Sequence, residues 1–283
     1  MQKRVLGNTG ELLSIVGFGG ILVMNETPAT ADKLVAQAIK AGINYFDVAP
    51  SYGNAEERLG PALEPYRKDV FLACKTTKRM ANEAEEEFEA SLQRMRTDHF
   101  DLYQFHSVTT MEDVDQITGP GGALELFQRV QREGRVRYLG MSAHSEEAAI
   151  ALLDRVDLDT VLYPVNWVTW NEGGFGLKLR DYAQAKGMGI LALKSLAKRK
   201  WNDDQERKAW PKCWYRPVES YEEALRGLRF TLQQGVTAAV TPGHAQFLDW
   251  AIQAADDYAF LTDKEQAEIA ELAKGLAPIF PMG

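Results

Sequence analysis

The chain has 283 residues, of which 45% are hydrophobic and 25% are charged, and its formal net charge is −8. This composition is typical of globular proteins and argues against a disordered or fibrous chain. The excess of acidic over basic residues argues against nucleic-acid binding. No apolar run approaches the length of about 18 residues that a membrane span needs, so no membrane association is expected.

The numbers of cysteines and histidines argue against a disulfide-stabilised or metal-binding protein. Cys74 and Cys213 are the two cysteines, too few for a disulfide framework or a cysteine zinc site, and the four histidines show no close metal-ligand pair. The N-terminus lacks the form of a signal peptide. We therefore expect a cytoplasmic protein without a metal centre.

The first predicted element is a small hairpin in which Arg4–Leu6 and Leu12–Ser14 flank a glycine-containing turn. Eight short apolar segments then recur along the chain, each followed by a helical pattern. They are continuous and rich in Val, Ile, Leu and Phe, as expected of parallel strands buried on both faces. The predicted strands are Ser14–Phe18, Ile43–Val48, Val70–Cys74, Phe100–Phe105, Val136–Gly140, Thr160–Val165, Gly189–Leu193 and Val236–Val240.

The segments between these strands have the apolar spacing of amphipathic helices. Asn82, Ser220 and Thr262 are predicted N-caps, because each has a glutamate three residues later, as in a capping box. Gly42 is predicted to end the first helix. The chain thus alternates strands and helices throughout its length.

Eight strand–helix units without an intervening linker predict one α/β domain over residues 1–283. The fold favoured by this pattern is a (β/α)₈ TIM barrel with a short N-terminal β-hairpin. A doubly wound open sheet is the alternative.

The segment Ser195–Pro217 is long and contains several aromatic residues among mixed charges. Long loops in compact domains are more often functional than not. Because it follows the seventh predicted strand, it is expected to overhang the C-terminal face of the barrel. We expect Trp201 or Trp214 to contribute an apolar wall to the substrate pocket.

Polar residues just beyond the carboxyl ends of barrel strands point into the active-site mouth. Tyr52 follows Asp47 on one such loop, and an Asp, a Lys, a His and a Tyr together can transfer a proton. A neighbouring ammonium stabilises a phenolate, so Lys75 is expected to lower the pKa of Tyr52. The strand-end candidates are Asp47, Lys75, His106, Ser142, His144, Asn166, Lys194 and Ser195.

Three local sequences resemble those of the aldo-keto reductase family. Residues 46–60 read FDVAPSYGNAEERLG, residues 101–106 read DLYQFH, and residues 134–142 read GRVRYLGMS. The first resembles the signature around the family's aspartate and tyrosine, and the second the segment that ends in its active-site histidine. The resemblance extends over nearly the whole chain, from the hairpin to about residue 255.

The resemblance implies a (β/α)₈ barrel that reduces small aldehydes or ketones with a nicotinamide cofactor. Tyr52 would then be the general acid that protonates the carbonyl oxygen. Lys75 would lower the pKa of this tyrosine, Asp47 would pair with Lys75, and His106 would orient the substrate carbonyl. The cofactor would supply the hydride.

The resemblance also implies where the cofactor binds, although the chain departs from the family there. Ser142 is followed by Ala143 where the family commonly has asparagine. The sixth strand lacks the expected glutamine, for which Asn166 is the substitute. Lys194 stands where a tyrosine commonly stacks on the nicotinamide. The expected cofactor-binding residues are Gly20, Ser142, Asn166, Lys194, Ser195, Leu196, Pro242, Gly243 and His244.

The segment after the eighth strand bears on the choice between NADP and NAD. Family members that prefer NADP usually carry basic residues there, whereas Thr241–Asp249 contains neither lysine nor arginine. Without charge-assisted hydrogen bonds to the extra phosphate, weak discrimination between NADPH and NADH is expected. Lys198 or Lys200 of the long segment is the alternative source of positive charge.

Two function classes follow. The first is an oxidoreductase that acts on small carbonyl compounds, favoured by the presence of all four polar residues of the tetrad Asp47, Tyr52, Lys75 and His106. The second is a nicotinamide-binding regulatory or redox-sensing protein with weak turnover, favoured by the altered cofactor contacts.

Overall fold

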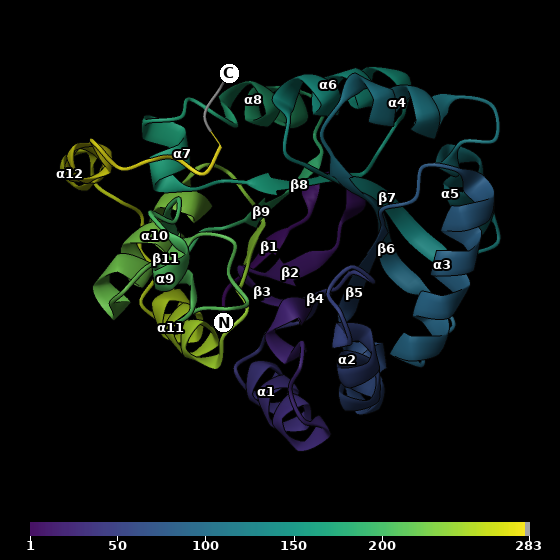
Figure 1. Ribbon diagram of the computed structural model, residues 1–283, viewed down its shortest axis with the longest axis horizontal. Helices are drawn as coiled ribbons and strands as arrows, with labels where there is room; N and C mark the ends of the chain where they lie inside the picture. Colours follow the sequence, from purple (N-terminus) through teal and green to yellow (C-terminus); the bar gives the residue numbers. More distant parts are fainter. Residues whose placement is uncertain (281–283) are drawn as a thin grey trace.

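The computed structural model describes residues 1–280, in which eight parallel strands close into a barrel surrounded by helices (Figure 1). The strands follow one another around the barrel in chain order, and β12 closes it between β9 and β3. The (β/α)₈ prediction is confirmed, and the open sheet is excluded. The barrel strands are β3 (Val16–Gly19), β4 (Tyr45–Asp47), β5 (Phe71–Thr76), β6 (Phe100–Val108), β7 (Val136–Ala143), β8 (Thr160–Pro164), β9 (Gly189–Leu193) and β12 (Ala238–Val240).

Helices cover the outside of the barrel and bury its apolar outer face. They are α1 (Pro28–Lys40), α2 (Ala55–Leu63), α3 (Ala81–Met95), α4 (Met111–Thr118), α5 (Ala123–Arg132), α6 (Glu146–Arg155), α7 (Trp167–Asn171), α8 (Leu177–Ala185), α10 (Tyr221–Gln233), α11 (Ala245–Asp256) and α12 (Asp263–Ala273). Short 3₁₀ turns are η1 (Gly7–Thr9), η2 (Gly20–Val23) and η3 (Glu64–Asp69). Within residues 1–280, no helix combines the length and apolarity that crossing a membrane requires.

The predicted helix ends are largely confirmed. The Ser220 hydroxyl accepts a hydrogen bond from the Glu223 amide at 3.3 Å, and Thr262 forms a complete capping box with Glu265. Gly42 follows the end of α1 with a positive φ of 85°. The Asn82 cap is wrong. The helix begins earlier, after Met80, because this residue forms a bridge with Gly122 that sets where the chain turns.

The N-terminal hairpin, formed by β1 (Lys3–Val5) and β2 (Leu12–Ser14), is also confirmed. It closes the amino-terminal end of the barrel, where Leu6 and Leu13 pack into the interior cluster with residues such as Phe71 and Leu102. Side chains alternate between the two faces of a strand. The same alternation that turns Phe71 and Leu102 inward therefore turns Lys75 and His106 toward the barrel axis, at the opposite end.

The long segment has structure of its own. β10 (Ala197–Arg199) and β11 (Arg216–Pro217) form a two-stranded sheet, and α9 (Asp204–Arg207) lies between them. Lys212 fastens the segment to η2 and the following turn, because its Nζ donates to the Leu22 carbonyl at 2.9 Å and to Glu26 Oε1 at 2.6 Å. This anchoring holds the segment over the carboxyl ends of the strands.

Candidate active site

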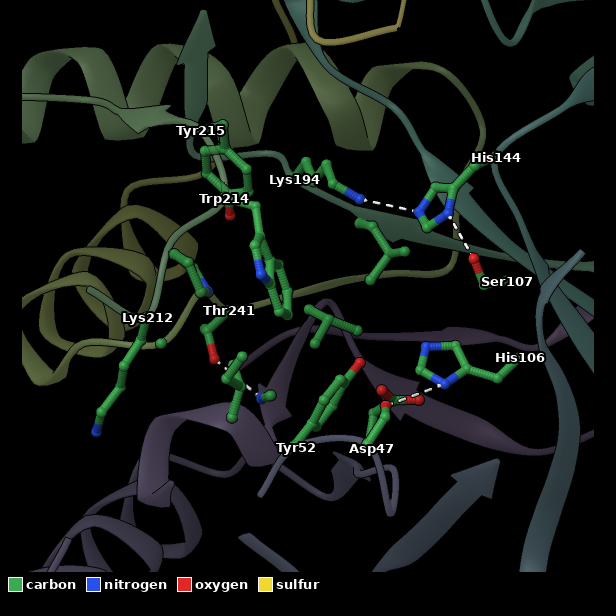
Figure 2. Close-up of a pocket in the computed structure, with 17 residues that line it drawn as sticks. Asp47, Tyr52, His106, Ser107, His144, Lys194, Lys212, Trp214, Tyr215 and Thr241 are labelled. Carbon is green, nitrogen blue, oxygen red and sulfur yellow. Dashed lines mark hydrogen bonds between the residues drawn. The ribbon is translucent and has the colours of Figure 1, made fainter. Parts of the chain in front are cut away.

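A cavity of about 320 Å³ opens at the carboxyl ends of the barrel strands (Figure 2). Its wall combines apolar side chains, including Leu193 and Val240, with a small number of polar ones, as is typical of small-molecule sites. The strand-end and loop residues that line it and that the sequence predicts to be functional are Asp47, Tyr52, His106, His144, Lys194, Pro242 and Gly243.

Lys75 lies directly beneath this cavity in a buried ion pair with Asp47. Each side chain is 1% exposed, and Lys75 Nζ also donates to the Val48 carbonyl at 3.2 Å. Asp47 Oδ2 accepts further hydrogen bonds from the Tyr45 hydroxyl and from Gln104 Nε2, both at 3.2 Å. Burial disfavours the charge on Lys75, but the attraction and hydrogen bond of Asp47, together with the influence of Tyr52 and Cys74, outweigh it and raise the Lys75 pKa. The lysine is therefore a fixed cation.

Tyr52 lies next to this cation. Lys75 Nζ is 5.3 Å from the centroid of the Tyr52 ring, and the His106 ring stands edge-on to it, with centroids 5.9 Å apart. The sequence predicts that Lys75 lowers the tyrosine pKa. In the structure Lys75 does act in that direction, but burial is the larger effect and the net pKa of Tyr52 is raised. The phenol therefore keeps its proton at neutral pH.

His106 is an uncharged imidazole at the same mouth. Burial, reinforced by the positive charge of Lys75, lowers its pKa to about 2. Its Nδ1 lies 3.3 Å from the Ser51 hydroxyl. The backbone around it is held by Arg79, whose Nη2 donates to the carbonyls of His106 at 2.9 Å and of Ser107 at 3.1 Å. The imidazole is thus positioned as a neutral hydrogen-bonding group.

A second polar cluster, formed by Ser107, His144 and Lys194, lies across the mouth from Tyr52 (Figure 2). The His144 ring lies 3.1 Å from Lys194 Nζ through Nε2 and 3.1 Å from the Ser107 hydroxyl through Nδ1. Ser107 and Lys194 have positive φ angles of 56° and 66°. Such strain in non-glycine residues is concentrated at functional sites.

The predicted cofactor residues fall into two groups. Lys194, Pro242 and Gly243 line the cavity, whereas the rest of the set lies behind or beside its wall. The Asn166 amide is used as the cap of α7, because it accepts from the amides of Val168 and Thr169 and donates to two carbonyls. The residues outside the lining are Gly20, Ser142, Asn166, Ser195, Leu196 and His244.

The segment after β12 carries the features of an anion-binding end. Helix α11 begins after His244, and no side chain caps its first amides, in contrast to α10 and α12. Free amides at a helix N-terminus suit a phosphate group. Lys212 crosses Gly243 so closely that an added Cβ would lie 2.5 Å from the Lys212 Cβ. The residues present therefore fit a dinucleotide, with Lys212 the nearest cation.

Of the two cations that the sequence offers as alternatives, Lys198 is paired elsewhere, and Lys200 is exposed and does not line the cavity. Lys198 pairs with Glu219 at 2.9 Å and with Glu223 at 2.7 Å. Lys212 is the long segment's cation at the cavity, and Glu26 already neutralises it. The segment thus provides positive charge near Gly243, but in an ion pair.

The long segment also supplies aromatic walls to the cavity. Trp214 and Tyr215 both line it, and the Trp214 ring centroid is 6.4 Å from that of Tyr52. The expectation of an aromatic contribution is confirmed for Trp214. Trp201 instead packs against the hydrophobic core, with the Arg216 guanidinium 6.0 Å from its ring centroid.

Sequence reasoning missed Gln104, Ser107 and Lys212. Gln104 could have been found, because it lies two residues before His106 and therefore on the same face of the strand. Ser107 directly follows the predicted histidine, but its inward direction depends on the positive φ and has no sequence signal. The contact of Lys212 with Gly243 depends on the path of the long segment.

Comparison with known proteins identifies the family. The profile of the aldo/keto reductase family matches residues 16–273. The chain belongs to this family. The cavity lies at the same strand ends that the sequence resemblance indicates. Curated relatives of this aldo-keto reductase include an uncharacterized oxidoreductase, YqkF, of Bacillus subtilis, which is 34% identical over 50% of this chain and 49% of its own length.

Other relatives have named substrates. L-galactose dehydrogenase of Arabidopsis thaliana is 29% identical over 70% of this chain and 66% of its own length. D-galacturonate reductase of Fragaria ananassa is 28% identical over 70% of this chain and 68% of its own. The chain thus spans half to two thirds of the length of these relatives. Among solved structures, the holo form of aldo-keto reductase AKR11C1 from Bacillus halodurans has the same fold, with a TM-score of 0.77, 24% identity and coverage of 99% and 98% of the two chains.

Proposed function

We propose that this aldo-keto reductase reduces a small aldehyde or ketone to an alcohol, with Tyr52 as the general acid. The observation that carries the proposal is the position of the Tyr52 phenol at the cavity, next to the Lys75–Asp47 pair. As the carbonyl oxygen gains negative charge, the phenol donates its proton to it. Because the pKa of Tyr52 is raised, the phenol stays protonated until negative charge develops on the carbonyl oxygen.

Lys75 acts on the tyrosinate that remains. The ammonium is buried and permanently charged, so it stabilises the phenolate in a site of low dielectric, where charge interactions are strong. Asp47 keeps the lysine charged, and its bonds from Tyr45 and Gln104 fix the carboxylate. The pair therefore makes the proton transfer less costly without itself exchanging a proton.

His106 orients the substrate. Because its pKa is about 2, it is a neutral imidazole that can donate one hydrogen bond to the carbonyl oxygen from the nitrogen not facing Ser51. With the Tyr52 hydroxyl, it would form two donors that meet at one oxygen. Trp214 and Tyr215 would exclude water from the reacting carbonyl.

A nicotinamide dinucleotide, NADPH or NADH, would supply the hydride when bound. The residues that fit it are Pro242 and Gly243 in the cavity wall and the uncapped amides at the start of α11. Because Lys212 is already paired with Glu26, we expect NADPH and NADH dissociation constants within about tenfold of each other, or about 1.4 kcal/mol.

Titration of both cofactors by protein fluorescence at pH 7.5 tests this preference. A preference for NADPH above about a hundredfold would show that the Lys212–Glu26 pair opens to receive the phosphate. The matched variant Glu26→Gln, which releases Lys212, should then bind NADPH more tightly than wild type.

The decisive test of the reaction is Tyr52→Phe. Loss of a positioned acid typically lowers the rate by about 10²–10⁴-fold, so carbonyl reduction should be abolished while cofactor binding survives. Steady-state oxidation of NADPH and NADH with a panel of aldehydes measures the first, and fluorescence titration the second. If the variant kept more than half of the wild-type turnover, the assignment of Tyr52 would be wrong.

The intact tetrad favours an enzyme over a nicotinamide-binding regulatory protein, since a protein that only binds cofactor has no need for the Lys75–Asp47 pair. Turnover by wild type in the aldehyde panel decides between the two. The expected cytoplasmic location and the small-molecule partner belong to the same proposal.

A further inference from the structure

Lys194 is a partly buried lysine that the proposed reaction does not use. Its side chain lines the cavity, and its Nζ has one hydrogen-bond contact, with His144 Nε2 at 3.1 Å. Within residues 1–280, no carboxylate lies within ion-pair distance of it. Burying an ammonium without a counter-ion is costly, and burial lowers its pKa to about 7.

The surroundings of Lys194 hold the ammonium in place without neutralising it. The Phe280 ring stacks on His144, with centroids 5.0 Å apart and planes at 6°, and it also lies 5.0 Å from Lys194 Nζ. A ring face attracts a cation only modestly. The left-handed backbone at Lys194 is itself strained, so this placement is maintained at a cost in stability.

The direction of the side chain distinguishes the two ends of the cavity. Lys194 points toward His144, which contacts Ser107, the residue next to the substrate-orienting His106 (Figure 2). The end at Gly243, where the dinucleotide fits, has Lys212 as its cation. The two lysines therefore serve opposite ends of the same cavity.

We propose that Lys194 and His144 form a receptor for a carboxylate carried by the carbonyl substrate. The ammonium would donate to one carboxylate oxygen, and the neutral His144 keeps the ammonium directed into the cavity. The favoured substrates are thus aldehydes or ketones that also bear a carboxylate, such as oxo acids and uronate-like sugar acids. This inference rests on the proposed function, because the carboxylate is recognised at the cavity where the carbonyl is reduced.

The experiment compares matched substrates that differ in charge at one position. The pairs are 3- and 4-carboxybenzaldehyde with their methyl esters, which have the same aldehyde and similar shape. A charge-assisted hydrogen bond in a buried site is expected to favour the acid over the ester in kcat/KM by about 10- to 100-fold for at least one isomer. In Lys194→Met this ratio should fall to about one or below.

Two matched lysine variants serve as controls. Lys212→Met removes the cation at the other end of the cavity, and Lys198→Met removes a surface lysine paired with Glu219 and Glu223. Both should keep the wild-type ratio of acid to ester. Binding of 4-(hydroxymethyl)benzoate to the enzyme, followed by the fluorescence of tryptophan, gives a readout without turnover, and Lys194→Met should weaken it by the same factor.

The outcomes separate this inference from the proposed function. An acid-to-ester ratio near one in wild type, or a ratio unaltered by Lys194→Met, overturns the carboxylate receptor while reduction of both aldehydes upholds the reductase. A loss of NADPH or NADH affinity in Lys194→Met without a change in the ratio also overturns it, because the lysine would then serve the cofactor. Failure of wild type to reduce any aldehyde of the panel with NADPH or NADH would instead refute the proposed function.

Discussion

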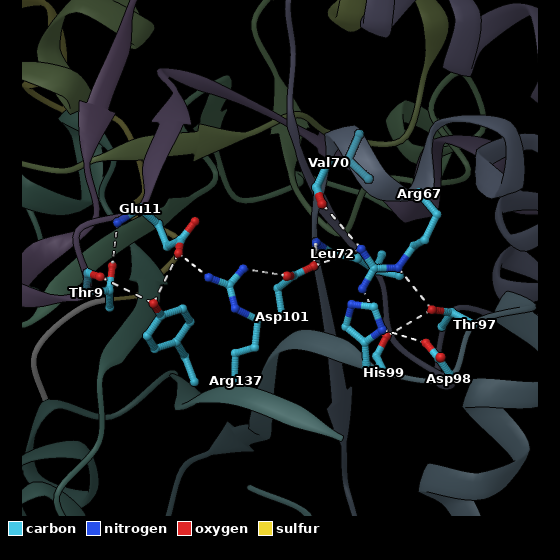
Figure 3. Close-up of polar contacts among 11 residues, drawn as sticks. Thr9, Glu11, Arg67, Val70, Leu72, Thr97, Asp98, His99, Asp101 and Arg137 are labelled. Atoms are coloured by element: carbon cyan, nitrogen blue, oxygen red, sulfur yellow. Dashed lines mark hydrogen bonds and ion pairs between the residues drawn. The ribbon is translucent and has the colours of Figure 1, made fainter. Parts of the chain in front are cut away.

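The two ends of strand β6 differ in how fully their polar side chains are hydrogen-bonded. At the amino-terminal end, Asp101 is 4% exposed and accepts from Arg137 at 2.9 Å, from Arg67 at 3.0 Å and from the Leu72 amide at 2.9 Å (Figure 3). At the other end, five residues along, the His106 side chain has a single hydrogen-bond contact among the described residues, with the Ser51 hydroxyl at 3.3 Å. One end is a completed network, and the other leaves hydrogen-bonding capacity for a ligand.

The network at the amino-terminal end extends to the hairpin that closes the barrel. Arg137 also pairs with Glu11, and the Tyr138 hydroxyl donates to Glu11 Oε1 at 3.1 Å. Arg67 donates to the Thr97 hydroxyl at 3.0 Å. Satisfied buried networks stabilise and fix a fold, whereas buried groups without partners reduce stability. The amino-terminal end of the barrel therefore has the features of a stabilising network, and the carboxyl-terminal end has those of a ligand site.

The largest expected effect comes from Lys75→Met at the mouth. It leaves the Asp47 carboxylate buried without its counter-ion, and it removes the cation that stabilises the Tyr52 phenolate. We expect kcat to fall about 10²–10⁴-fold and the free energy of unfolding to fall by about 3–5 kcal/mol. Steady-state kinetics and urea unfolding measure the two.

A double variant separates these effects. In Asp47→Asn/Lys75→Met the unpaired charge is gone, so most of the lost stability should return while the activity does not. Recovery of activity in this double variant would contradict the role of Lys75 at Tyr52.

Asp101→Ala tests the other end. Removing this carboxylate leaves Arg67 and Arg137 with fewer partners, so the free energy of unfolding should fall by about 2–3 kcal/mol, which corresponds to about 5–10 °C in Tm. The value of kcat/KM at 25 °C should stay within about twofold of wild type. Glu89→Ala, which removes a surface pair with Arg135, is the control and should cost less than about 1 kcal/mol. A large loss of activity in Asp101→Ala would show that the network at the amino-terminal end also supports catalysis.

The sequence predicts the eight strands and the tetrad because both depend on local patterns. Buried parallel strands are continuous apolar runs, and the candidate site residues Asp47, Lys75 and His106 lie in the last residues of their strands, so their positions follow from where the apolar runs end. The network around Asp101 joins residues far apart in the chain, such as Glu11 and Arg137, and no local pattern indicates that they meet. Ion pairs between such distant residues form only when the barrel closes, so they are known only from the folded structure.

The sequence predicts the positions of the candidate residues better than their pKa values. The effect of Lys75 on Tyr52 has the expected direction, but the degree of burial, which decides the net pKa, is known only from the packed structure. Asn166 shows the same limit. A strand-end asparagine suits a ligand or a helix cap equally well, and the position of α7 makes it a cap. The local sequence does not distinguish these uses.

Arg79→Met is expected to have an intermediate effect, because Arg79 acts on the site through the backbone. It donates to the carbonyls of His106 and Ser107 and pairs with Asp113 at 2.8 Å. Small displacements of a positioned group reduce rates markedly, so we expect kcat to fall about tenfold with little change in cofactor affinity. Arg155→Met, which removes an exposed arginine paired with Asp115, is the control. Equal losses of kcat in both variants would show a general structural effect instead of positioning.

The smallest predicted effect is a pH dependence that belongs to Lys194. Its pKa of about 7 means that the free enzyme carries the ammonium below that pH and loses it above. The two histidines of the cavity titrate below this window, because His106 and His144 have pKa values of about 2 and about 3, and the pKa of Tyr52 is raised. Since a carboxylate binds the ammonium form, kcat/KM for a carboxybenzaldehyde should fall by about fourfold between pH 6.0 and 7.5, whereas that for its methyl ester should not follow this curve. Lys194→Arg keeps its charge throughout and should flatten the profile for the acid. Identical pH profiles for acid and ester in wild type would show that Lys194 does not bind the carboxylate of the substrate.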